Sequence, residues 1–269
     1  MSDVAYGPLL VNLGITAAAI VVTMAVTLAV AQARGKHSVI DVVWGLGFAI
    51  IAAVTYVMSS GDGDDLRRLL LLLLPVLWGG RLAAYIGRRN AGQPEDPRYV
   101  ELLKGEGHPV LVALRKVYLP QGVIMWLVAL GVQVGAYTEG PVTLLAWAGV
   151  AVWAVGVFFE AVGDAQLAAF KKDPANKGQV MDRGLWRYTR HPNYFGDACV
   201  WWGIWLVAGI SWPWLVAALC PALMTYLITA KTGKALLEKS MGSSKPGYAA
   251  YVERTSGFFP LPPKRAGGG

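Results

Sequence analysis

The 269-residue chain is 55% hydrophobic and only 15% charged, with a mean hydropathy of +0.45, a balance that excludes an ordinary soluble domain. Its formal net charge is +7, and its two cysteines, Cys199 and Cys220, lie in or beside apolar segments, where we expect them to pack without forming a disulfide. The composition predicts an integral, multi-pass membrane protein whose main partner is the lipid bilayer, with no nucleic-acid partner and no prediction of oligomeric state.

Apolar stretches of roughly membrane-crossing length follow one another along the whole chain. Each approaches the ~20 residues that a helix needs to cross ~30 Å of hydrocarbon. The sequence predicts an all-α polytopic bundle of about seven transmembrane helices in a single domain, residues 1–265, with 266–269 set aside as an appended tail. The predicted spans are about 9–31, 38–58, 69–85, 119–137, 142–162, 198–211 and 213–230.

Lysine and arginine gather in alternate connections between these spans. If the N-terminus is outside, the inner segments 32–37, 86–118, 163–197 and 231–269 carry 21 of the 24 Lys and Arg residues. The positive-inside rule then predicts an outer N-terminus and a cytoplasmic C-terminus.

The second and third predicted spans each carry a polar group near the inner side. Asp41 opens the second span, and Arg81 and Tyr85 lie toward the end of the third. Asp41 could lie in boundary water and Arg81 could snorkel inward, or both could line a polar cavity. The glycines of the WGGR sequence would let another backbone or a ligand approach the third span.

Two carboxylates follow the fifth span. Glu160 and Asp164 are separated by four residues, so a helix places them on one face. Two acids at the exit of a membrane helix repel each other. They therefore need neighbouring cationic side chains or a ligand.

The segment RGLWRYTRHPNYFGD, residues 183–197, combines cations, aromatics and one amide. Arg187, Arg190 and His191 are cationic donors, Tyr188 offers a stacking face, and Asn193 can bond a heterocycle or a ribose. Pro192 and Gly196 predict a turn before the sixth span.

The C-terminal tail repeats this combination with helical spacing. Lys245, Tyr248, Tyr251 and Arg254 recur every three residues, which predicts one face of a helix. Cations and aromatics from two separated segments favour a pocket for an anionic, aromatic cofactor. A basic helix on the membrane surface is the alternative.

Common cofactor motifs are missing from the sequence. No G-x-G-x-x-G follows a strand pattern, and no G-x-x-x-x-G-K-[ST] occurs. The three histidines form no H-E-x-x-H motif, so we expect no metal site. Redox chemistry would need a bound organic cofactor.

The motif GLWRYTRHPNYFGD followed by WWG, with LLEK and KPGYAAYVERTSGFFP later in the chain, resembles the steroid 5α-reductase-like superfamily of membrane sterol reductases. The resemblance covers roughly residues 36–262, is strongest over 140–262, and is closest to the bacterial branch. It implies NADPH as cofactor and hydride transfer to an activated C=C bond of a steroid, prenyl or acyl lipid substrate. It also implies a bacterial inner membrane with the cofactor on the cytoplasmic side.

The resemblance implies roles for individual residues. Asn193 and Asp164 match contacts to the nicotinamide and ribose, and Asp197 matches a position that is usually Glu and faces the substrate. Asp41 and Tyr85 match, more loosely, the acid and tyrosine that polarise the substrate carbonyl. The predicted catalytic residues are Asp41, Tyr85 and Asp197, and the predicted cofactor-binding residues are Glu160, Asp164, Lys171, Arg187, Tyr188, Arg190, His191, Asn193, Lys245, Tyr248, Tyr251 and Arg254.

Two other functions stay open at this point. A more remote similarity to isoprenylcysteine carboxyl methyltransferase implies S-adenosylmethionine as cofactor, although the Arg and Lys residues between 171 and 190 favour a phosphorylated ligand. A non-catalytic lipid-binding or transport protein is the other alternative, which the lack of an inverted repeat disfavours.

Overall fold

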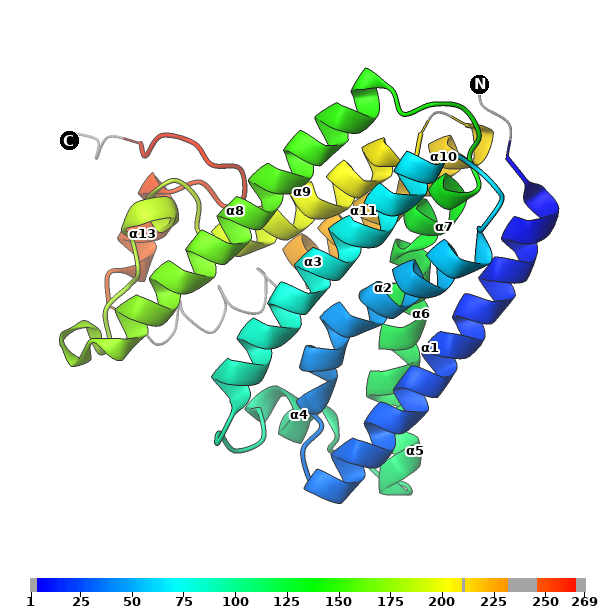
Figure 1. Cartoon of the computed structure of the whole chain (residues 1–269). Coiled ribbons are helices and arrows are strands. Elements are labelled where there is room, and N and C mark those ends of the chain that lie inside the picture. The colour runs from blue at the N-terminus through cyan, green and yellow to red at the C-terminus, as the bar shows by residue number, and fades with distance from the viewer. Residues whose placement is uncertain (1–3, 210, 232–245, 265–269) are drawn as a thin grey trace. The chain divides into compact units, whose positions relative to one another are not determined.

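The computed structural model describes residues 4–209, 211–231 and 246–264 (Figure 1). These residues form helices and the connections between them, with two isolated β-bridges, Val4 with Thr138 and Thr189 with Ser256, and no strand within the ranges described. The chain divides into two compact units. Unit 1 comprises residues 1–147 and 204–220, and unit 2 comprises 148–203 and 221–269. The all-α architecture is confirmed, whereas the single domain over 1–265 stays a prediction.

Unit 1 is built around α2, which packs against α1 and α3 and also contacts α6 and α7 (Figure 1). A short π-helix, η1, joins α5 to α6 without a break. The bounds are α1 Tyr6–Arg34, α2 Val39–Met58, α3 Asp65–Asn90, α4 Pro97–Leu102, α5 Pro109–Ala113, η1 Leu114–Tyr118, α6 Leu119–Val128, α7 Leu130–Ala136 and α10 Trp212–Ala217.

Unit 2 contains most of the long helix α8 and most of α9, with the loop between them and the C-terminal helix α13. The bounds are α8 Leu144–Lys172, η2 Pro174–Asn176, η3 Gly184–Arg187, α9 Pro192–Val207, α11 Leu219–Tyr226, η4 Leu227–Lys231 and α13 Tyr248–Arg254. The last residues of α9 and the first residues of α11 belong to unit 1.

Six helical stretches of the described chain are long and apolar enough to cross a membrane: Tyr6–Arg34, Val39–Met58, Asp65–Asn90, Pro109–Ala136, Leu144–Lys172 and Trp212–Ala230. The protein is therefore an integral, multi-pass membrane protein. Six of the seven predicted spans correspond to these stretches. The remaining one, 198–211, corresponds to α9, which has 16 residues and a length of about 24 Å, somewhat less than the hydrocarbon thickness.

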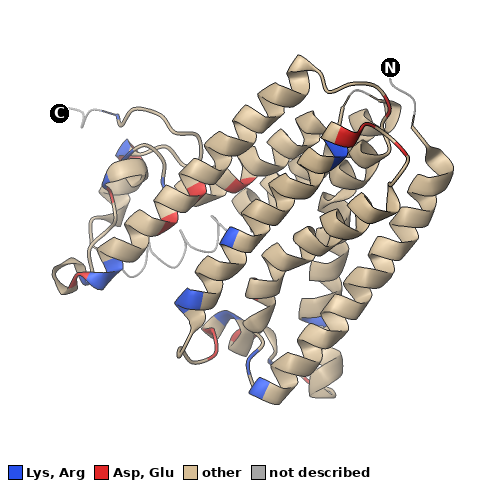
Figure 2. Cartoon of the chain, viewed as in Figure 1, with Lys and Arg blue, Asp and Glu red and all other residues tan. Residues whose placement is uncertain are grey.

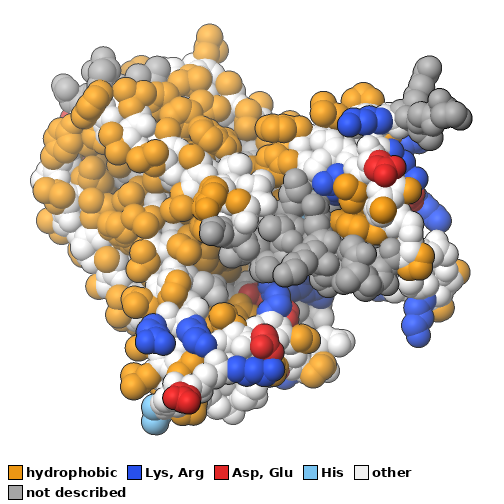
Figure 3. Space-filling model, turned by 180° about the vertical axis from the view of Figure 1, so that it is seen from behind, with side chains coloured by type: hydrophobic (Ala, Val, Ile, Leu, Met, Phe, Trp, Pro, Cys, Tyr) orange, Lys and Arg blue, Asp and Glu red, His pale blue; other side chains and the backbone are white. Residues whose placement is uncertain are grey.

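The outer surface of the helices suits a lipid environment. Large apolar side chains such as Leu10, Val21, Val57 and Leu77 are more than half exposed. Figure 3 shows hydrophobic side chains over most of one face of unit 1, with charged groups gathered toward one end. In Figure 2 the length of α1 is almost free of charge. Lipid chains can cover such surfaces without a free-energy cost, whereas exposing them to water is unfavourable.

A pair of glycines brings α2 and α3 together in unit 1. A Cβ atom on Gly45 would lie 2.4 Å from the Gly79 carbonyl oxygen, and a Cβ on Gly79 would lie 2.2 Å from the Gly45 oxygen. The WGLG and WGGR sequences thus serve backbone-to-backbone packing, as small residues do in membrane helices.

Two buried arginines begin α3. Arg67 is 2% exposed, and its guanidinium donates to the carbonyl oxygens of Thr138 at 2.6 Å and Pro141 at 3.1 Å. Arg68 is 7% exposed and donates to the Ser59 hydroxyl at 2.9 Å. These side chains tie the connections at this end of unit 1 together.

One local prediction is wrong. Pro192 and Gly196 do not form a turn, because α9 begins at Pro192 and Gly196 lies inside it. Proline is well suited to a helix start, because a backbone N–H at that position would have no intrahelical partner and its absence costs no hydrogen bond. Helix α8 also continues ten residues past the predicted end at 162.

Candidate functional site

Glycines set the close approach of α8 and α9 within unit 2. A Cβ on Gly196 would lie 2.5 Å from the Gly156 carbonyl oxygen and 2.7 Å from the Glu160 nitrogen. One heptad further, a Cβ on Gly203 would lie 2.6 Å from the Gly149 oxygen. The two backbones are therefore in direct contact, which fixes the position of the polar side chains that both helices carry.

The polar side chains on this contact are mostly carboxylates. Glu160 and Asp164 lie one turn apart on α8 and are 4% and 6% exposed, so their predicted placement on one helix face is confirmed. Asn193, in the first turn of α9, donates its Nδ2 to Asp164 Oδ1 at 3.5 Å. Asp197 lies half-buried one turn along α9 from Asn193. Three acids and an amide thus lie on the contact between α8 and the start of α9.

The loop between α8 and α9 is tied to α8 close to these acids. The Trp186 indole donates to the Gly163 carbonyl oxygen at 3.0 Å, next to Asp164 in sequence. One turn further, Gln166 Oε1 accepts from the Leu185 backbone nitrogen at 2.9 Å. Helix η3 is thereby held against the C-terminal half of α8.

Helix α13 docks onto the same loop. The Arg190 guanidinium donates to the carbonyl oxygens of Val252 at 3.1 Å and Thr255 at 2.7 Å, groups that the end of a short helix leaves unsatisfied. The buried Tyr251 hydroxyl donates to the Trp186 carbonyl oxygen at 2.6 Å, and burial raises the pKa of Tyr251. The two separated cationic and aromatic segments of the sequence are therefore side by side.

The docking separates the predicted cofactor-binding residues of the loop and of α13, together with Lys171, by their exposure. Arg190, His191, Tyr248 and Tyr251 are less than 9% exposed, and the His191 ring stacks on Tyr194 with centroids 5.3 Å apart. The exposed residues are Lys171, Arg187, Tyr188 and Arg254, of which Arg254 pairs with Asp182 at 2.5 Å. Lys245 lies outside the described residues.

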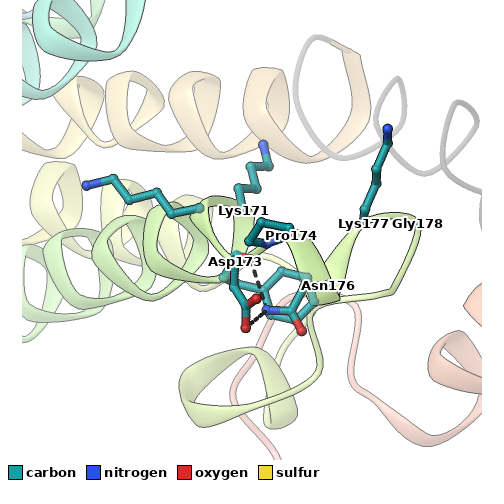
Figure 4. A pocket seen from close by; sticks show the side chains of 8 residues that line it. Lys171, Asp173, Pro174, Asn176, Lys177 and Gly178 are labelled. Atoms are coloured by element: carbon teal, nitrogen blue, oxygen red, sulfur yellow. Dashed lines mark hydrogen bonds between the residues drawn. The ribbon is translucent and has the colours of Figure 1, made fainter.

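A hollow of about 280 Å³ lies at the C-terminal end of α8 (Figure 4). Asn176 Nδ2 donates to the Phe170 carbonyl oxygen at 3.0 Å and to Asp173 Oδ2 at 3.3 Å, which orders the turn. Lys171 and Lys177 extend from the ribbon around the hollow, which Lys172 also lines. Three lysines against one bonded aspartate make this part of unit 2 cationic.

The remaining predicted catalytic residues lie in unit 1. Asp41 is half-buried, and its carboxylate accepts from the Tyr99 hydroxyl at 2.5 Å and from Arg98 at 3.0 Å. Burial and the Asp41 charge both raise the pKa of Tyr99, so this phenol stays protonated. Tyr85 is half-buried, with the Arg81 guanidinium 5.9 Å from its ring centroid.

The contacts of Tyr99 and Glu95 cannot be predicted from the sequence. Glu95 accepts from the backbone nitrogens of His37 and Ser38, just before α2, although 57 and more residues separate them in the chain. A local signal did exist for the helix that carries Tyr99. Asp96 followed by proline is a common helix start, and Asp96 does cap α4 by accepting from the Arg98 nitrogen at 2.8 Å.

Comparison with protein families gives one match. A family model described as a protein of unknown function, DUF1295, covers residues 27–255, which is most of the chain. The chain belongs to the DUF1295 family. No curated protein matches this DUF1295 protein, and no solved structure does.

The residues gathered in unit 2 of this DUF1295 protein fit a phosphorylated dinucleotide chemically. Exposed lysines and arginines suit phosphates, and the acids and amide near the start of α9 suit ribose hydroxyls and a carboxamide. Among the described residues, no group of His, Cys, Asp and Glu is arranged to hold a metal ion.

Proposed function

We propose that this DUF1295 protein is an integral membrane reductase that uses NADPH to reduce an activated C=C bond in a steroid or another lipid. The docking of α13 onto the loop between α8 and α9 carries the proposal. Tyr251 bonds the Trp186 carbonyl, and the Trp186 indole bonds α8 beside Asp164. The two segments that resemble the steroid 5α-reductase-like superfamily are thereby neighbours within unit 2.

The proposal assigns binding roles according to exposure and charge. Lys171, Arg187 and Arg254 are exposed cations and would hold the phosphates of NADPH. Asp164 and Asn193 would bond the ribose and the carboxamide, because they already lie within hydrogen-bond distance of each other. The cationic hollow around Lys171 favours a phosphorylated cofactor over S-adenosylmethionine, which has no phosphate.

When bound, NADPH supplies a hydride. The side chains then have to orient the substrate and deliver a proton as charge develops on the conjugated oxygen. In unit 1, Asp41 is the candidate acid, and Tyr99 is a positioning residue whose hydroxyl donates to the Asp41 carboxylate at 2.5 Å. Asp197 on α9 is the candidate for contacting substrate in unit 2.

Ligand binding to the purified full-length protein in detergent tests the proposal. NADPH, NADH and S-adenosylmethionine are titrated separately while thermal unfolding is followed by tryptophan fluorescence. A ligand at 100 times its Kd stabilises the folded state by about 2.7 kcal/mol. We expect NADPH to raise the unfolding temperature and S-adenosylmethionine to leave it unchanged.

Matched variants locate the binding site. Asn193→Ala removes the amide beside Asp164 and is expected to weaken NADPH binding by up to about tenfold, since one lost hydrogen bond to an uncharged cofactor group amounts to about 0.5–1.5 kcal/mol. Asn90→Ala, at the end of α3 in unit 1, is the control and should bind normally. Equal affinities in the two variants would remove the site assignment.

Transfer of the label from deuterated NADPH to an unsaturated lipid, seen by mass spectrometry, tests the reaction itself. Stabilisation by S-adenosylmethionine alone would replace the proposal with a methyltransferase. Stabilisation by lipids without either cofactor would replace it with a non-catalytic lipid-binding protein.

A further inference from the structure

Four uncharged polar side chains meet inside unit 1, within segments that composition marks as membrane-spanning. Asn12 and Thr16 belong to α1, Thr55 to α2 and Gln133 to α7. All four are at most 1% exposed. The three helices pack against one another, so this polar cluster is enclosed by them.

Hydrogen bonds join the cluster across all three helices. Asn12 Nδ2 donates to Thr55 Oγ1 at 3.3 Å and to Gln133 Oε1 at 3.4 Å. The Thr16 hydroxyl lies 2.5 Å from Gln133 Oε1, and the Trp126 indole donates to Thr16 Oγ1 at 3.1 Å. These bonds use only one of the two polar atoms of each amide.

The other atom of each amide is buried without a partner. Within the described part of the chain, Asn12 Oδ1 and Gln133 Nε2 have no hydrogen-bond partner. Exchanging the oxygen and nitrogen of either amide does not remove the problem, because the neighbours bond only one end of each group. In a membrane span neither bulk water nor lipid chains can satisfy these atoms.

We propose that this cluster is a binding site for one hydroxyl group, supplied either by a single internal water molecule or by a lipid alcohol. A hydroxyl oxygen accepts from the Gln133 amide while its hydrogen is donated to Asn12 Oδ1, which satisfies both groups at once. The ligand is uncharged because the four side chains are uncharged. The part of the ligand that contacts the cluster is small because the four side chains are enclosed.

None of these side chains is among the proposed cofactor-binding residues. The site does not depend on the proposed reductase activity. Its occupant would supply the hydrogen bonds that the two amides otherwise lack. It would thereby hold α1, α2 and α7 in one register. Internal water serves unpaired buried polar groups in this way in many proteins.

Nuclear magnetic resonance of the full-length protein in detergent micelles tests the water alternative. The side chains of glutamine and tryptophan are labelled with 15N, and the Gln133 amide signal is assigned from its loss in Gln133→Met. We expect a nuclear Overhauser effect between this amide and water in the unmodified protein. The Trp214 indole, which donates to the Trp205 carbonyl oxygen at 2.6 Å, is the buried control and should show none.

Mass spectrometry of extracted lipids tests the lipid alternative. A hydroxyl-bearing lipid should be present in near-equal molar amount with the wild-type protein and absent from Asn12→Leu/Gln133→Met. Water contact or a bound lipid alcohol would support the proposal. Absence of both in the unmodified protein overturns it, and that result does not depend on whether any variant folds.

Discussion

Replacing Gly196 by alanine tests whether the contact between α8 and α9 positions the proposed cofactor site. The new Cβ would lie 2.5 Å from the Gly156 carbonyl oxygen and 2.7 Å from the Glu160 nitrogen. Both obstacles are backbone atoms, so no side-chain rotation can relieve them. To lengthen the shorter contact to 3.4 Å, the two helices must separate locally by about 0.9 Å.

The energetic cost follows from two opposing effects. Alanine is favoured over glycine inside a helix by about 0.5–1 kcal/mol. Forcing a methyl group into a filled contact costs about 1–3 kcal/mol. We expect Gly196→Ala to lower the free energy of unfolding by about 1–2 kcal/mol, and to lengthen the 3.5 Å contact between Asn193 and Asp164.

Thermal unfolding in one detergent measures the first effect, and NADPH titration measures the second. Gly80→Ala on α3 is the matched control, because no heavy atom lies within 4 Å of the added Cβ. It should be neutral or slightly more stable than the wild type. The reasoning is refuted if Gly196→Ala unfolds at the same temperature as Gly80→Ala.

Three further predictions concern polar contacts. Arg190→Ala leaves the Val252 and Thr255 carbonyls without their guanidinium donor. It should lower the free energy of unfolding by about 1–3 kcal/mol and speed hydrogen exchange in α13. Exchange of α13 at the wild-type rate would contradict this. Burial alone would raise the pKa of Glu95, but hydrogen bonds from the Ser38 side chain and from nearby backbone N–H groups lower it. The stabilisation is therefore complete above the ordinary value of 4.5 and is lost as the pH falls through the lower folded-state pKa; Glu95→Gln should abolish this acid-side loss in a pH series of unfolding temperatures. Tyr99→Phe leaves the Asp41 carboxylate without the hydrogen bond that it accepts from the Tyr99 hydroxyl, so it should lower the free energy of unfolding by about 1–3 kcal/mol. An unfolding temperature equal to that of the wild type would contradict this.

Hydropathy predicts the membrane-spanning helices because burial in lipid requires long apolar runs, whatever the details of packing. It cannot define where those helices end. Helix α8 continues to Lys172, since backbone hydrogen bonding proceeds into water while hydropathy falls at the membrane boundary. The prediction of a turn at Gly196 is wrong for a related reason. Gly196 contacts Gly156, which lies 40 residues earlier, and such a contact has no local signature in the sequence.

In the candidate site too, local spacing can be predicted from the sequence, whereas contacts between distant residues cannot. Helical spacing correctly predicts that Glu160 and Asp164 share a face and that Tyr248 to Arg254 form a helix. The partnership of Asp41 with Tyr99 spans 58 residues and depends on how the connection after α3 folds back. No periodicity in the sequence encodes such a contact.

The burial of Arg67 has a consequence for biosynthesis. Its acceptor, the Thr138 carbonyl, lies 71 residues further along the chain, so it is synthesised well after the start of α3. Until then the guanidinium must keep its hydration or bind lipid headgroups. The contact that ties the start of α3 to the connection after α7 therefore forms only once that connection has been synthesised.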